Sequence, residues 1–169
     1  MRGRAIRWIL PLLLVSVAGV GVAMAATAST TSKSGTVMTV HSSKFGTILV
    51  ASNGMTLYRY TPDKKNASTC SGACASYWPP LLVKGAAKPT AGSGANASLL
   101  GTTKRSNGAM QVTYAGWPLY FYAGDKKAGQ TNGQGFEKSW YVVGTTGALV
   151  KAPVKTTGTT TAKKKSAWG

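Results

Sequence analysis

The feature that most constrains the fold of this chain is an internal repeat with a spacing of 62 residues. Residues 53–65 read NGMTLYRYTPDKK, and residues 115–127 read AGWPLYFYAGDKK. The same spacing relates further pairs on both sides of this phrase, namely Gly46 and Gly108, Val50 and Val112, and Trp78 and Trp140. Self-similarity in a fixed register indicates a duplicated structural unit. The sequence therefore predicts repeat one over residues 46–83 and repeat two over residues 108–145.

Short runs rich in Val, Thr and Tyr, separated by Gly, Asn and Pro, predict β-strands rather than helices. The predicted strands are residues 37–41, 47–51, 56–60, 109–114, 118–122, 140–143 and 148–151. Asn and Gly tolerate positive φ, so 52–54 and 144–147 are predicted hairpin turns. We expect an all-β fold in which two tandem antiparallel β-meander repeats of roughly 40 residues pack together as a small sandwich or barrel-like domain. The Gly/Ala/Ser-rich stretch 85–101 would link the halves.

The two ends of the chain differ in character from this domain. Three arginines precede the apolar run 8–24, and Ala-Met-Ala at 23–25 fits a small-residue cleavage site, which predicts a secretory signal peptide over residues 1–25. An N-terminal membrane anchor is the alternative, because the run is almost long enough to span a bilayer. Composition predicts a flexible linker at 26–35, the duplicated all-β domain at 36–153 and a disordered basic tail at 154–169.

Cys70 and Cys74 are the only cysteines, in the sequence C-S-G-A-C. In an exported protein an even pair predicts a disulfide. The loop that it closes is short, so its stabilisation should be low, about 1–2 kcal/mol. A redox pair would more usually have C-x-x-C spacing, and a metal site would need further ligands, whereas His41 is the only histidine and lies far away in the sequence. We therefore predict a structural disulfide and assign no metal site.

The charge is strongly positive, with 20 Lys and Arg against 3 Asp and Glu and a net charge of +17. Loss of Arg2, Arg4 and Arg7 with a signal peptide would leave +14. Such a surface attracts polyanions, which outside the cytosol include anionic cell-wall polymers and membrane headgroups. A nucleic-acid partner requires a recognition motif as well as charge, and none is present, so we expect no specific nucleic-acid binding. A merely solubilising surface is the alternative.

Two of the three acidic residues, Asp63 and Asp125, stand at the same point of the repeated phrase, three residues after its second tyrosine. Asp just beyond a strand commonly accepts backbone N–H groups and stabilises a turn, and a Tyr hydroxyl or a Trp indole N–H could also donate to it. The alternative is a paired carboxylate site for a hard cation or for acid/base chemistry on a glycan. Two lysines follow each Asp and oppose cation binding. Glu137, the third acid, has no repeat partner.

The aromatic residues of the repeats allow two interpretations. They form the core of the domain, or they form a platform for sugars, and the core is the commoner outcome in a small β domain. Strand alternation places Tyr58 and Tyr60 on one face and Leu57 and Arg59 on the other. Because Arg59 is expected to be exposed, the Tyr face should point inward. The repeated positions are Tyr58, Tyr60, Asp63, Trp78, Tyr120, Tyr122, Asp125 and Trp140.

LYRYTPD, CSGACASYWPPL, GWPLYFYAGD and TNGQG together resemble the secreted-repeat predicted lipoprotein family that carries a Y-x-(F/W/Y)-x-x-D motif. The resemblance covers residues 47–150, and the motif falls on the repeated residues above and on Cys70 and Cys74. It implies a bacterial, extracytoplasmic protein, secreted or associated with the cell envelope, without an established activity. The chain departs from the lipoprotein pattern because no cysteine precedes Cys70.

These observations predict an exported, non-enzymatic protein that its basic surface holds near anionic wall or membrane polymers. The alternative is a small-ligand or metal-binding module at the repeat interface, and a glycan hydrolase is a third hypothesis. No catalytic residue and no cofactor is assigned, because no G-x-S-x-G elbow, phosphate-binding loop or haem attachment motif is present.

Overall fold

The computed structural model describes residues 34–154. The predicted signal peptide or anchor, nearly all of the predicted linker and all but the first residue of the predicted tail lie outside the described residues. Within 34–154, no helix is long and apolar enough to cross a membrane.

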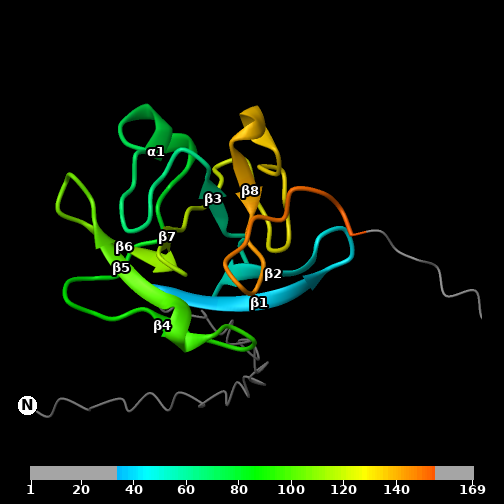
Figure 1. The fold of residues 1–169 in the computed structure, drawn as a ribbon, viewed down its shortest axis with the longest axis horizontal. Coiled ribbons are helices and arrows are strands. Elements are labelled where there is room, and N and C mark those ends of the chain that lie inside the picture. The colour runs from blue at the N-terminus through cyan, green and yellow to red at the C-terminus, as the bar shows by residue number, and fades with distance from the viewer. Residues whose placement is uncertain (1–33, 155–169) are drawn as a thin grey trace, which may run out of the picture.

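The described residues are nearly all β, as predicted, and form three small sheets (Figure 1). The first contains β2 (Gly46–Ala51), β1 (Thr36–Ser42) and β4 (Thr90–Ala91), and the second contains β3 (Tyr58–Tyr60) and β8 (Trp140–Val142). The third contains β5 (Leu100–Lys104), β6 (Met110–Tyr114) and β7 (Trp117–Pro118). The helical elements are α1 (Ala73–Tyr77) and the 3-10 turns η1 (Ala97–Leu99) and η2 (Phe136–Lys138). The sheets pack in a sandwich-like arrangement without closing into a barrel.

Equivalent antiparallel hairpins, β1–β2 and β5–β6, open the two halves of the domain, and their first strands β1 and β5 precede the predicted repeat starts at residues 46 and 108. The segment that follows each hairpin donates a backbone hydrogen bond to the second strand of that hairpin. Leu57 N–H donates to Leu49 O at 3.1 Å, and Leu119 N–H donates to Val112 O at 3.0 Å. Leu49 is therefore the structural counterpart of Val112, and the predicted pairing of Val50 with Val112 is wrong by one residue. The connection to Leu119 is one residue shorter than its counterpart, which a fixed spacing could not reveal.

The repeats are joined by strand pairing between them rather than by simple side-by-side packing. β3 of repeat one pairs antiparallel with β8 of repeat two. Tyr58 and Tyr120, which are equivalent, form an antiparallel bridge in which Tyr58 N–H donates to Tyr120 O at 2.8 Å and Tyr120 N–H donates to Tyr58 O at 3.0 Å. An approximate twofold axis therefore passes between these two residues.

Two clusters of buried side chains make up the core. One is mainly aliphatic and lies between the two hairpins, with Leu49, Leu57, Val112 and Leu119 at its centre. The other is mainly aromatic and lies on the far side of the central bridge, and it includes Tyr58, Trp78, Tyr120 and Trp140. The aromatic residues of the repeats therefore lie in the core, with part of their surface at a pocket described below.

Several local predictions differ from the structure. β5 lies largely in the stretch predicted to follow the linker and was not expected, because Leu100 is the only large apolar residue in LGTTK and the strand depends on pairing with β6. Residues 148–151 make only an isolated bridge, between Val143 and Leu149, and not a strand. The predicted strand 118–122 is reduced to β7 and bridges at Tyr120. The short helix α1 was not predicted either.

The predicted turns at 52–54 and 144–147 are present, with Gly54 and Gly147 at φ 77° and 83°.

Arg59 contradicts the expectation that its side chain is exposed, since only 8 % of its surface is accessible. Its guanidinium carbon lies 3.9 Å from the ring centroid of Trp117, and Nη1 donates to Gly147 O at 2.5 Å. Burial lowers its pKa to about 10, which still leaves it charged at neutral pH. The aromatic face and the carbonyl replace part of the water around the cation, and its Nε has no hydrogen-bond partner among residues 34–154. Both faces of β3 are consequently covered.

Candidate functional site

The two repeated aspartates are held by tyrosines of the opposite repeat. Tyr58 Oη donates to Asp125 Oδ2 at 2.7 Å, and Tyr120 Oη donates to Asp63 Oδ2 at 2.6 Å. The two contacts are equivalent under the approximate twofold axis. All four side chains are at least 95 % buried. The repeated phrase thus makes its Tyr–Asp hydrogen bonds between repeats and not within one repeat.

The second oxygen of each carboxylate holds the loop that follows it. Asp63 Oδ1 accepts from Thr69 N at 2.7 Å and from Thr69 Oγ1 at 2.9 Å. Asp125 Oδ1 accepts from Asn132 N at 2.9 Å. Each Asp therefore joins its own loop to the other repeat, which is a turn-stabilising arrangement with both oxygens already engaged.

Burial is the largest cause of the pKa shifts of Tyr58, Tyr120 and Asp125. Burial, together with the hydrogen bond to Asp125, raises the pKa of Tyr58 well above its ordinary value. Burial and the hydrogen bond to Asp63 do the same to the pKa of Tyr120. Burial also raises the pKa of Asp125, while its hydrogen bonds from Tyr58 and Asn132 oppose the shift. The tyrosines are thus neutral donors throughout the physiological pH range.

The loop after each Asp also rests on the glycine turn of the other repeat. Asn66 N–H donates to Gly116 O at 2.7 Å, and Gly129 N–H donates to Gly54 O at 3.1 Å. Gly54 and Gly116 have φ of 77° and 80°, a conformation that favours glycine. Both ends of the repeated phrase, its glycine and its aspartate, are therefore used in contacts between repeats.

A column of four aromatic rings crosses the repeat interface. The equivalent residues Trp78 and Trp140 stack with ring centroids 3.8 Å apart and an interplanar angle of 1°. Tyr60 stacks on Trp140 at 4.3 Å, and Tyr122 lies against Trp78 at 4.4 Å. Each Trp is thus covered on one face by its counterpart and on the other by a Tyr of the opposite repeat.

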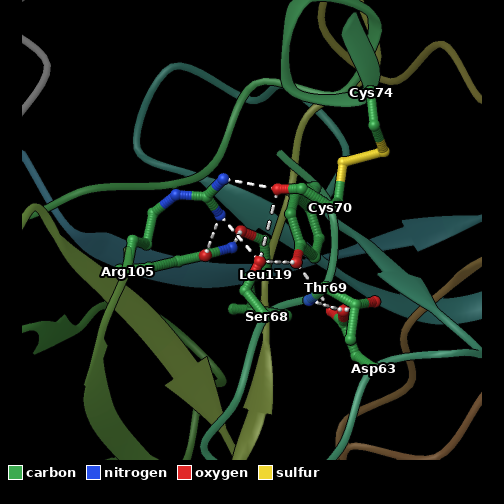
Figure 2. Close-up of a disulfide and its surroundings, with 9 residues drawn as sticks. Asp63, Ser68, Thr69, Cys70, Cys74, Arg105 and Leu119 are labelled. Carbon is green, nitrogen blue, oxygen red and sulfur yellow. Dashed lines mark hydrogen bonds between the residues drawn. A yellow bond between two sulfur atoms is a disulfide. The ribbon is translucent and has the colours of Figure 1, made fainter. Parts of the chain in front are cut away.

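A disulfide is present in repeat one alone. Cys70 and Cys74 are bonded, with their Cα atoms 5.3 Å apart, at the start of α1. Figure 2 shows the guanidinium of Arg105 beside this bridge, donating to Cys70 O and, at 2.8 Å, to Ser68 Oγ. Ser68 Oγ in turn lies 2.7 Å from Tyr120 Oη. Sequence reasoning did not single out Arg105, because its role depends on β5 lying against the disulfide loop.

A pocket of about 470 Å³ opens between α1 and η2, at the edge of the aromatic column. α1 and η2 rise together on the side of the molecule opposite β1 (Figure 1). The pocket is lined from repeat one by Tyr60, Cys74, Tyr77 and Trp78, and from repeat two by Phe136, Glu137 and Trp140. Neither Asp63 nor Asp125 lines it.

The structure brings the six repeated aromatic residues into one cluster and hydrogen-bonds Asp63 and Asp125 to two of its tyrosines. Of these eight residues, only Tyr60, Trp78 and Trp140 line the pocket. Tyr77 and Phe136 were missed, because neither is repeated. The available signal was their position next to, or shortly before, each repeated Trp. Within residues 34–154, no group of three or more His, Cys, Asp or Glu side chains is arranged to hold a metal ion.

The sequence model of a family described as a secreted repeat of unknown function matches residues 39–82 and 101–144, which together make up just over half of the chain. The two matched ranges begin 62 residues apart, the spacing of the internal repeat. No curated protein and no solved structure matches the chain.

Proposed function

Since this chain belongs to the family of secreted repeats of unknown function, we propose that it is an exported, non-enzymatic protein of the bacterial cell envelope. In this proposal residues 1–25 direct export, and the basic surface retains the folded domain near anionic wall polymers or anionic membrane headgroups.

The distribution of charge carries this proposal. Every lysine of residues 34–154 is exposed, namely Lys44, Lys64, Lys65, Lys84, Lys88, Lys104, Lys126, Lys127, Lys138 and Lys151. Asp63 and Asp125 are buried against tyrosines and offer no surface counter-charge. The positive field is therefore almost uncompensated at the surface, as retention by a polyanion requires.

The geometry of the aspartates favours a non-enzymatic role. A general acid or a nucleophile must reach a substrate, whereas both oxygens of each Asp accept internal hydrogen bonds in buried surroundings. The paired Asp residues thus have the geometry expected of a structural element.

Retention by charge is tested by sedimenting the purified protein with an isolated bacterial wall fraction and, separately, with phosphatidylglycerol vesicles and zwitterionic vesicles. We expect retention by at least one anionic partner at low salt and release at high salt, because screening weakens surface charge interactions. Absence of retention by both anionic partners at low salt would overturn the proposal.

A second candidate function is a small-ligand module at the repeat interface. The observation that favours it is the pocket between α1 and η2, to which both repeats contribute. Its volume lies within the range of small-ligand sites, roughly 300–1,000 Å³.

A further inference from the structure

The pocket between α1 and η2 has a floor of residues that are the same in both repeats and walls of residues that differ between the repeats. Its floor contains the equivalent residues Trp78 and Trp140. At the spacing of 62 residues, however, the wall residues Tyr77, Phe136 and Glu137 correspond to Ser139, Cys74 and Ala75. The repeated Tyr, Asp and Trp residues make the contacts that join the two repeats. Of the wall residues, Phe136 also packs against Trp78 and Tyr122, whereas the side chains of Tyr77 and Glu137 are exposed and are available for recognition.

The second feature of the floor is the indole N–H group of each tryptophan. Trp78 and Trp140 are 3 % and 2 % exposed. Among the residues that the structure describes, neither indole nitrogen has a hydrogen-bond acceptor, and neither is completely closed off from solvent. Buried indole N–H groups normally find an acceptor. Both tryptophans line the pocket, so these two unpaired donors belong to residues that a bound ligand would touch.

The orientation of the rings selects the ligand chemistry. A pocket that binds an organic cation presents the negative faces of its aromatic rings. Here the faces of Trp78 and Trp140 are covered by each other and by tyrosines, so only the edges of the two indole rings can contact a ligand in the pocket. Ring edges carry partial positive charge and the N–H donor, and they favour an acceptor oxygen over a cation.

The walls provide an acceptor and apolar contact surface. The carboxylate of Glu137 makes no hydrogen bond or ion pair with the described residues. Glu137 and Lys138 have φ of 47° and 53°, a strained conformation for residues with side chains that is often found at ligand sites. Tyr77 and Phe136 are 67 % and 41 % exposed, and they stand at the rim of the pocket.

We propose that this pocket binds a short, neutral saccharide that carries acetamido groups. The acetamido carbonyl accepts from an indole N–H, and the acetamido N–H donates to Glu137. Its methyl group and the C–H face of the sugar ring contact Tyr77 and Phe136. This inference rests on the second candidate function and is independent of retention by the basic surface.

The test is a titration of the ¹⁵N-labelled protein with chitobiose, the disaccharide of N-acetylglucosamine, followed through the indole N–H signals. The experiment is carried out at high salt, where retention by charge is screened, so its failure leaves the first proposal standing. We expect saturable shifts of the Trp78 and Trp140 signals and none of the Trp117 signal, because Trp117 lies elsewhere, against Arg59. Cellobiose, which has the same ring without acetamido groups, should leave the signals of Trp78, Trp117 and Trp140 in place.

The variants Glu137→Ala and Tyr77→Ala should each raise the dissociation constant of chitobiose about tenfold, the effect of one lost charged hydrogen bond or one lost ring contact. Lys138→Gln is the matched control, since Lys138 is adjacent but does not line the pocket, and it should bind normally. Both wall residues are exposed, so the variants should keep the parent's unfolding midpoint. Unmoved indole signals, equal shifts with cellobiose, or unchanged affinity in both wall variants would overturn the proposal.

Discussion

Tyr58 and Tyr120 occupy the same position in the two repeats and hydrogen-bond to each other through both of their backbone N–H and C=O groups, at 2.8 and 3.0 Å. From this bridge their side chains extend to Asp125 and Asp63 of the opposite repeats. One antiparallel contact thus fixes the relation between the repeats. The stability of the whole domain should consequently depend on the residues around it.

Replacing Tyr58 by Phe should lower the free energy of unfolding by about 1–3 kcal/mol, because the buried Asp125 carboxylate loses a donor that water cannot replace. Tyr120→Phe should have a similar effect through Asp63. Urea denaturation measures both. The control is Tyr141→Phe, whose hydroxyl donates to the exposed Lys138 O, with an expected change below about 0.5 kcal/mol. Equal effects of Tyr58→Phe and Tyr141→Phe would contradict the structural role of the Tyr–Asp pairs.

Stability should fall at alkaline pH because of these two tyrosines. Their pKa is raised in the folded state. Their contribution is therefore complete below the unfolded pKa of about 10 and is lost as pH rises above it, because only the unfolded chain then releases the protons. Each tyrosine contributes a limiting slope of about −1.4 kcal/mol per pH unit.

The Tyr58→Phe variant isolates this effect, since Arg59 and the other titrating groups remain the same in both proteins. Its free energy of unfolding should decline less steeply above pH 10 than that of the parent, when both are measured by denaturation across that range. Parallel curves for parent and variant would show that Tyr58 titrates normally in the folded protein.

The two glycine turns should differ in their tolerance of alanine. At Gly116 a Cβ meets nothing closer than 3.5 Å, so Gly116→Ala incurs mainly the cost of positive φ, roughly 1–2 kcal/mol. At Gly54 a Cβ would lie 2.8 Å from Ala128 Cβ and would push the loop after Asp125 away. Gly54→Ala should therefore be the more destabilising in thermal or urea unfolding. Gly108→Ala, with φ of 84° and open space around it, is the reference for the backbone cost alone. If Gly54→Ala and Gly108→Ala are equally stable, the close contact with Ala128 is unimportant.

Removing the disulfide should weaken the domain without unfolding it. Cys70 and Cys74 close a short loop, so the double variant Cys70→Ala/Cys74→Ala should lose about 1–2 kcal/mol. Arg105 still holds the Cys70 carbonyl through its guanidinium. Urea midpoints of the parent with and without reductant, compared with the double variant, measure the effect. Complete unfolding of the reduced parent in the absence of urea would show that the bridge holds the fold and not only its loop.

The sequence by itself determined the duplication, the all-β class and the glycine turns. These are local or periodic properties: strand composition, positive φ at Gly54 and Gly147, and identity at one fixed spacing. It was less informative where an element depends on its neighbour, as β5 depends on β6 and as Arg59 depends on the Trp117 ring. Neither residue type nor period carries that information.

The tertiary structure alone decided which copies of the repeated residues meet. In the sequence, Tyr58 is five residues from Asp63 and 67 from Asp125, and local chemistry allows a hydrogen bond to either. The antiparallel bridge between Tyr58 and Tyr120 places each Tyr hydroxyl beside the Asp of the other repeat. In the same twofold arrangement Trp78 stacks on Trp140, and the unrepeated residues Tyr77 and Glu137 line one pocket. Long-range pairing determines these contacts, because identical repeats offer identical partners until their relative orientation is fixed.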